Sequence, residues 1–255
     1  MQHIIKYGLY DITRNKVLIA YTLFLLCLSF GLYTLEGQSN KATLSLLNVM
    51  LILIPLVSIV FSTIYYYNAY EFTELLLAQP LPRRHILIGQ YISIATALTL
   101  AYLIGIVLPV LLNDASPQGY WLLLTGFLLT LVFVSMAFLS AVFTRDKARG
   151  IGVALLIWFY FTLLYDGIIL LILFSFNDYP LEKAVIALSM LNPIDMGRIA
   201  VIMKMETAAL MGYTGAVFQD FLGTTKGLVI SFTVIILWIM IPLGVVIMIF
   251  KHKDL

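Results

Sequence analysis

The sequence has little charge for its length. Of its 255 residues, 11% are Asp, Glu, Lys or Arg and 62% are hydrophobic, whereas a soluble domain has about 25% charged residues. So few charged side chains cannot cover a protein of this size in water, which excludes a soluble enzyme and a disordered chain. The formal net charge of +2 is too small to indicate a nucleic-acid partner. The sequence therefore predicts a polytopic membrane protein.

Side chains that carry common membrane chemistries are also scarce. Cys27 is the one cysteine, which excludes an intramolecular disulfide and a CxxC metal site. The three histidines, His3, His85 and His252, lie outside the apolar runs, which excludes a membrane b-type cytochrome. The motifs HExxH, GxSxG and GxxxxGK[ST] are absent, so we expect no zinc protease, serine hydrolase or nucleotide-binding site. We expect a non-catalytic subunit without a cofactor, whose energy source lies in another chain.

Six apolar runs have about the 20 residues that a membrane-spanning helix needs. They cover residues 17–34, 44–67, 89–112, 120–143, 151–176 and 227–250. Asp166 is the one charged residue inside them. The runs lack the alternation of a barrel strand, and an open sheet would leave backbone groups unpaired in lipid. We therefore predict an all-α fold with six transmembrane helices, in a single domain that covers residues 1–255.

Positive charge is divided unequally between the two sides of these spans. Ten of the 15 Lys and Arg residues lie on one set of flanks. Four of the other five lie in one long connection, where the topology rule is weak. Because Lys and Arg gather on the cytoplasmic side of short loops, we expect both termini in the cytoplasm and residues 177–226 outside.

Two segments outside the spans are also predicted to be helical. Residues 1–15 place Ile5, Leu9 and Ile12 on one face, which is typical of an amphipathic helix in contact with membrane lipid. Residues 181–191 are apolar but too short to span a bilayer, so they predict a re-entrant or interfacial helix.

The connection at residues 68–85 contains the strongest pattern in the chain. Glu71 and Glu74 are one turn apart on the same face of a predicted helix. Leucines continue this helix, and Pro80 ends it before Arg83 and Arg84. The residues alone allow an ordinary charged connection, but they also predict a short, stiff helix presented to the cytosol between the second and third spans.

This segment resembles the coupling segment of ABC-2 type transporter permeases. There, an acidic residue, a leucine-rich stretch, a proline turn, an arginine pair and a glycine precede the third span. Phe72 and Ala78 depart from the family's usual small or polar residues at these places. The resemblance implies a homodimer with a cytoplasmic ATPase partner. It assigns ATPase coupling to seven residues: Glu71, Glu74, Leu75, Leu76, Pro80, Arg83 and Arg84.

A narrower resemblance rests on three stretches, residues 75–93, 152–174 and 191–202. Together they are similar to the membrane subunits of nitrous oxide reductase maturation transporters, and LNPIDMGR is the most specific part. This resemblance implies a bacterial inner-membrane location and a periplasmic solenoid partner. It also implies a role in assembly of the copper–sulfur centre of the reductase. A general ABC-2 exporter of lipid, drug or polysaccharide and a membrane scaffold without an ATPase are the alternatives.

Charged and polar residues near the outer side are further candidates. Asp166 is a candidate for a gate or cargo path, or else an acid that reaches the outer interface or bonds to a tyrosine. Asn192, Pro193, Asp195 and Arg198 are candidates for docking an external partner. Asp195 either caps the helix after Pro193 or pairs with Arg198. Five of the ten methionines lie between residues 190 and 211, and we interpret them as packing residues, not as a metal site.

Overall fold

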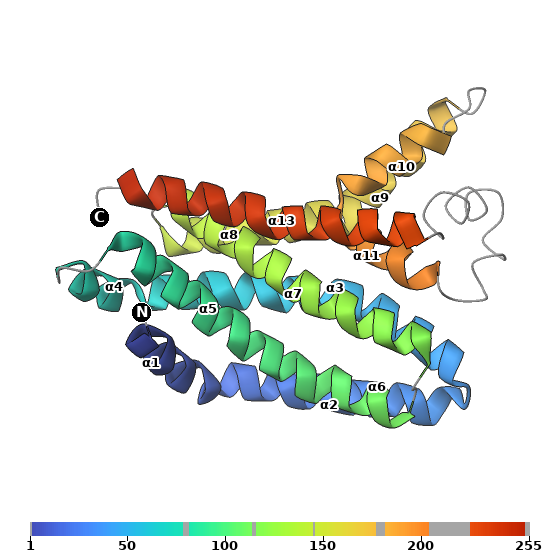
Figure 1. The fold of residues 1–255 in the computed structure, drawn as a ribbon, viewed down its shortest axis with the longest axis horizontal. Helices are drawn as coiled ribbons and strands as arrows, with labels where there is room; N and C mark the ends of the chain where they lie inside the picture. The colour runs from blue at the N-terminus through green and yellow to red at the C-terminus, as the bar shows by residue number, and fades with distance from the viewer. Residues whose placement is uncertain are drawn as a thin grey trace.

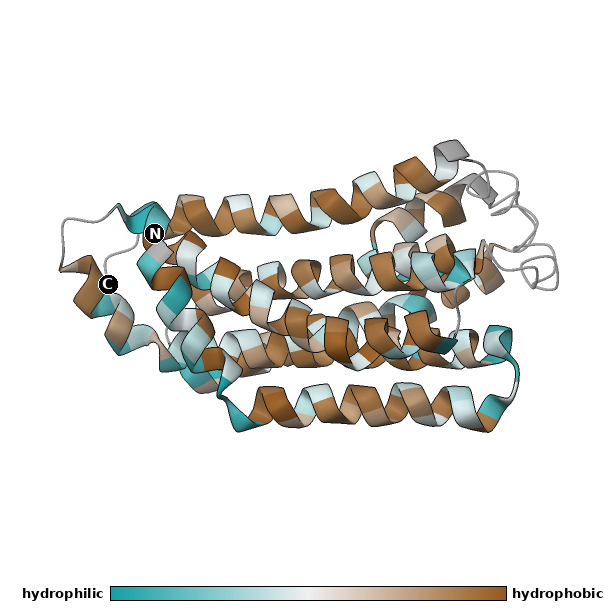
Figure 2. Ribbon diagram, turned by 60° about the horizontal axis from the view of Figure 1, so that its bottom comes forward, coloured by the Kyte–Doolittle hydropathy of each residue, from teal (hydrophilic) through white to brown (hydrophobic). Residues whose placement is uncertain are grey.

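The computed structural model describes residues 2–78, 82–113, 116–144, 146–176, 182–203 and 225–252. In these ranges the chain is helical and contains no strand. Six of the helical segments are long and apolar enough to cross a membrane. In Figure 1 they run along the long axis of the molecule, and in Figure 2 hydrophilic residues gather toward the two ends of this bundle. The predicted all-α fold with six candidate spans is confirmed.

Each span begins before the apolar run that predicts it, because its helix already includes polar residues that precede the run. The spans are α2 (Lys16–Glu36), α3 (Ser39–Asn68), α5 (Arg83–Tyr102) with η1 (Leu103–Val107) and α6 (Leu108–Asn113), α7 (Pro117–Phe143), α8 (Lys147–Phe159) with η2 (Tyr160–Leu164) and α9 (Tyr165–Ser175), and α13 (Thr225–His252). The elements η1 and η2 are single π-helical turns inside the third and fifth spans. The shorter helices are α1 (Gln2–Thr13), α4 (Tyr70–Leu77), α10 (Glu182–Met190) and α11 (Pro193–Ile202).

Local side-chain bonds explain where several spans begin. Asn15 and Ser116 each accept a hydrogen bond from a backbone N–H in the first turn of α2 and α7. Asp146 does the same for α8. Such caps satisfy backbone donors that a helix start leaves without partners. Gly37, with φ of 62°, ends α2 in the left-handed conformation that glycine adopts readily, and α3 begins two residues later.

Helix α7 lies at the centre of the bundle. In the most apolar 18-residue stretch of each span, 67% of the residues are buried for α7, against 22% for α2, 11% for α8–α9 and 17% for α13. A Cβ atom at Gly126 would lie 2.7 Å from the Tyr102 ring, so this glycine allows α5 and α7 to pack closely. The Tyr102 hydroxyl donates to the Leu123 carbonyl at 2.9 Å. The spans α2, α8–α9 and α13 leave long apolar faces outside this packing.

The N-terminal helix is present, but its most buried face differs from the predicted one. Ile4 and Ile12 are the buried residues, with 7% and 0% exposure, whereas Ile5 and Leu9 are half-buried. The cause is close packing on α5, because a Cβ at Gly8 would lie 2.6 Å from the Ser93 Oγ. Helix α1 is therefore anchored to the third span, and its place at the membrane surface stays a prediction.

Candidate functional site

The short helix α4 presents two acidic side chains on its exposed face. It follows α3 after a turn at Ala69, whose carbonyl accepts the backbone N–H of Thr73 at 2.9 Å. Glu71 and Glu74 are exposed, and Leu75 is 69% exposed. Figure 1 shows α4 beside the start of α1, at the end of the bundle where α13 also finishes. The predicted helix and its exposed acidic face are thus present.

The other residues assigned to coupling lie in different surroundings. Pro80 is outside the described residues. Arg83 and Arg84 form the first turn of α5 and are exposed. Leu76 points inward, where it forms an apolar cluster with Ile4 and Ile86. This cluster joins α4, α1 and α5, so Leu76 connects α4 to the bundle and is not part of the exposed face.

A buried hydrogen bond joins α4 to the third span. The Gln90 Nε2 donates to the Thr73 Oγ1 at 2.6 Å, and Thr73 donates in turn to the Ala69 carbonyl at 2.7 Å. Both side chains are buried, with 5% exposure each. A polar side chain in a transmembrane helix commonly bonds to a neighbouring helix. The lone amide in the apolar run at residues 89–112 was the sequence signal for this contact.

A second set of polar contacts joins the end of α3 to the turn between α7 and α8. The Tyr67 hydroxyl donates to the Thr144 carbonyl at 3.2 Å. The Lys147 Nζ donates to the Asn68 Oδ1 at 2.7 Å. Because α4 continues directly from α3, it is connected to the third span through Gln90 and to the fourth and fifth spans through α3.

At the other end of the bundle, α10 and α11 form a bent hairpin. Their axes meet at 113°, and Figure 1 shows α10 projecting outward while α11 lies along α13. A Cβ at Gly197 would lie 2.8 Å from the Thr125 side chain, so α11 packs closely on α7. The helix predicted within residues 181–191 is confirmed as α10.

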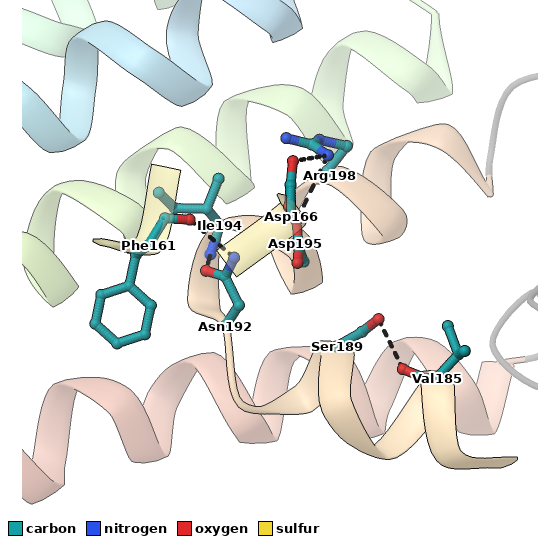
Figure 3. Close-up of polar contacts among 8 residues, drawn as sticks. All are labelled: Phe161, Asp166, Val185, Ser189, Asn192, Ile194, Asp195 and Arg198. Carbon is teal, nitrogen blue, oxygen red and sulfur yellow. Dashed lines mark hydrogen bonds and ion pairs between the residues drawn. The ribbon is translucent and has the colours of Figure 1, made fainter. Parts of the chain in front are cut away.

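Asn192 holds the bend of this hairpin against the fifth span. Its Oδ1 accepts the Ile194 N–H at 3.0 Å, which caps α11, and its Nδ2 donates to the Phe161 carbonyl at 2.9 Å (Figure 3). Phe161 lies in η2, where the π-helical turn interrupts the regular α-helical ladder. The suggestion that Asp195 caps this helix is therefore wrong, because Asn192 does so.

One arginine binds two carboxylates beside this bend. The Arg198 Nη1 lies 3.0 Å from the Asp166 Oδ2 and 3.5 Å from the Asp195 Oδ1 (Figure 3). The predicted pairing of Asp195 with Arg198 is confirmed. The partner of Asp166 is this same arginine, a pairing that the sequence did not indicate.

Burial differs among the three charged side chains. Those of Arg198 and Asp166 are 35% exposed, whereas that of Asp195 is 8% exposed. The planar guanidinium can bind two carboxylates at once, so it holds the hairpin to α9 and lies beside the buried Asp195 carboxyl group. The Tyr165 hydroxyl adds a further link, because it donates to the Leu188 carbonyl at 2.6 Å.

Comparison with known proteins identifies the family of this bundle. Residues 2–255 match the family model of the ABC-2 family transporter proteins. The chain belongs to the ABC-2 transporter family. It is 30% identical over 227 residues to a probable ABC transporter permease protein NosY of Pseudomonas aeruginosa, covering 79% of this chain and 81% of the relative. It is 28% identical over 222 residues to the protein of the same description from Stutzerimonas stutzeri, covering 77% and 79%.

Membership of this family gives the helices a role in an ABC transporter. The chain is a NosY-like ABC-2 permease, a multi-pass membrane subunit, and such a permease implies a partner ATPase subunit. In this permease, α4 lies at one end of the bundle and the α10–α11 hairpin lies at the other.

Proposed function

We propose that this ABC-2 permease transmits the movement of a cytoplasmic ATPase from α4 to the α10–α11 hairpin. The transporter would support maturation of the copper–sulfur centre of periplasmic nitrous oxide reductase, in a bacterial inner membrane. The proposal rests on the contrast between the two faces of α4. Its outer face shows Glu71 and Glu74 to a partner, and its inner face is bonded to the third span through Thr73 and Gln90.

The path to the hairpin runs through the central span. Helix α4 acts on α5 and α3, and both pack against α7. Helix α11 packs on α7 and α13, and its bend is bonded to the fifth span at Phe161. A tilt of α7 would therefore shift the hairpin, and the Asp166–Arg198 pair would open or close with it as a gate.

The outer surface of the hairpin is the proposed docking face for a periplasmic solenoid protein. Asn192, Pro193 and Asp195 are buried, so they act by positioning the hairpin, and Arg198 is half-buried beside them. The apolar faces that α2, α8–α9 and α13 leave outside the bundle suit a second copy of the chain and lipid. A homodimer would place two coupling helices on two ATPase subunits.

Reversing both acidic charges of α4 is expected to remove the ATPase. In the double variant Glu71→Lys and Glu74→Lys, repulsion at the docking face should weaken ATPase binding by at least about tenfold. The measurement is affinity purification from the native membrane in mild detergent, followed by mass spectrometry of the retained proteins. Glu36→Lys, at the C-terminal end of α2, is the matched control and should retain the ATPase.

The proteins retained by the unmodified chain separate the candidate functions. An ATPase together with a periplasmic repeat protein supports the maturation role. An ATPase alone indicates a general exporter of lipid, drug or polysaccharide. Absence of an ATPase, in membranes that contain one, contradicts the coupling proposal and leaves a scaffold.

A further inference from the structure

A cavity of about 250 Å³ lies where α1, the end of α3 and the start of α4 meet. The side chains of Tyr7, Asp11, Tyr65, Asn68 and Phe72 are among those that line it. Gly8 lies at its base in α1 and keeps that helix close to α5. Figure 1 shows α1 and α4 at the same end of the bundle. The function proposed above does not use this cavity.

The cavity combines a carboxylate with aromatic walls. Asp11 of α1 and Tyr65 of α3 both line it, so the carboxylate shares the cavity with the tyrosine ring. Among the described residues, the ion pairs all lie at the hairpin, and no lysine or arginine pairs with Asp11. A carboxylate beside tyrosine and phenylalanine rings is the chemistry that binds an ammonium group, through charge-assisted hydrogen bonds and the negative faces of the rings.

A cationic side chain lies next to this acidic cavity. The Lys147 ammonium bonds to Asn68, a lining residue. A ligand that places an ammonium on Asp11 would thus meet positive charge at the cavity rim. This arrangement suits a zwitterion whose second charged group is a phosphate.

The position of the cavity favours a lipid as the source of this zwitterion. Tyr65 is in the last turn of the second span, where tyrosines lie at the level of the headgroups. Tyr7, an aromatic residue that lines the cavity, is 66% exposed on the amphipathic helix α1. A lysine or arginine of a partner protein offers the positive charge alone and would leave the basic rim without a counterpart.

We propose that this cavity binds the headgroup of phosphatidylethanolamine, with the primary ammonium on Asp11 and the phosphate toward Lys147. With the orientation in the proposed function, this lipid would belong to the cytoplasmic leaflet; the binding itself does not rest on that orientation. An occupied cavity would hold α1 against α4, and so set the resting position of the coupling helix by the lipid around it.

The test is lipid retention by the purified full-length permease. The protein is transferred from nanodiscs with equal parts of phosphatidylethanolamine, phosphatidylcholine and phosphatidylglycerol into detergent, and the bound lipids are counted by native mass spectrometry. The unmodified chain should retain phosphatidylethanolamine preferentially. Asp11→Asn should lower that preference about tenfold, because a charge-assisted hydrogen bond is lost. Tyr7→Ala should lower the preference less. Because the Tyr7 ring is exposed, its removal should not cause misfolding.

Glu36→Gln, which neutralises an acid outside the cavity, is the matched control and should retain the preference. Equal retention of all three lipids by the unmodified chain, or an unchanged preference in Asp11→Asn, would overturn the proposal. The proposal would also be overturned if the ATPase released the lipid and also bound more weakly to Asp11→Asn. The cavity would then receive a side chain of the partner. Failure of the ATPase-coupling proposal leaves these lipid counts unaffected.

Discussion

Replacing Gln90 with leucine is expected to weaken coupling between the ATPase and the permease while the fold stays intact. The substitution removes the bond from Gln90 Nε2 to Thr73 Oγ1, which is worth about 1 kcal/mol, so coupling should fall about fivefold. The Gln90 Oε1 is buried without a partner among the described residues, so leucine also removes an unsatisfied acceptor. The stability of the solubilised protein should therefore change little.

The readout is the rate of ATP hydrolysis by the reconstituted complex divided by that of the isolated ATPase. Thr73→Val removes the same bond from the other side and should produce the same loss. The double variant should be no worse than either single variant, because residues that act through one contact are not additive. Ser29→Ala, which removes a buried hydroxyl from α2, is the control. Additive losses in the double variant would contradict a shared contact.

Replacing Arg198 with methionine is expected to release the α10–α11 hairpin from the fifth span. The change leaves the Asp195 carboxylate, 8% exposed, without its cation. Removing one partner of a fully buried pair costs about 3–5 kcal/mol. Because the side chains of Arg198 and Asp166 are each 35% exposed, solvent reduces the expected loss to about 2 kcal/mol.

Hydrogen exchange of the hairpin amides measures this release. A loss of about 2 kcal/mol should speed their exchange about 30-fold, with no change in α5. The double variant Asp195→Asn and Arg198→Met should recover much of the protection, because the buried charge is gone. Arg149→Met, at an exposed position in the first turn of α8, should leave exchange unchanged. Unaltered hairpin exchange in Arg198→Met would show that the ion pairs do not hold it.

The sequence predicted those elements whose signal is local. A long apolar run has no alternative to a helix in lipid, so the six spans were predictable, although the polar first turn of α5 at Arg83 was not included in its span. The acid pair and leucines before Pro80 likewise predicted α4. The buried face of α1 was off by one residue at Ile4, because packing on α5 and not the bilayer selects the face.

Contacts between segments could not be predicted in the same way. A charged residue at Asp166 calls for a partner inside the membrane, but its pairing with Arg198, 32 residues away, depends on the 113° bend of the hairpin. The bond between Gln90 and Thr73 depends on how α4 and α5 are rotated after the proline turn. Such relative rotations follow from packing, which a single sequence does not specify.

Nucleotide-driven movement at α4 is expected to reach the hairpin. Leu191, 57% exposed at the bend, is replaced with cysteine in a Cys27→Ser background, and its rate of reaction with a membrane-impermeant maleimide is measured in the reconstituted complex. We expect a several-fold difference between the nucleotide-free and vanadate-trapped states, and a loss of that difference when Gln90 is replaced with leucine. Equal rates in both states, in a complex that hydrolyses ATP, would contradict it.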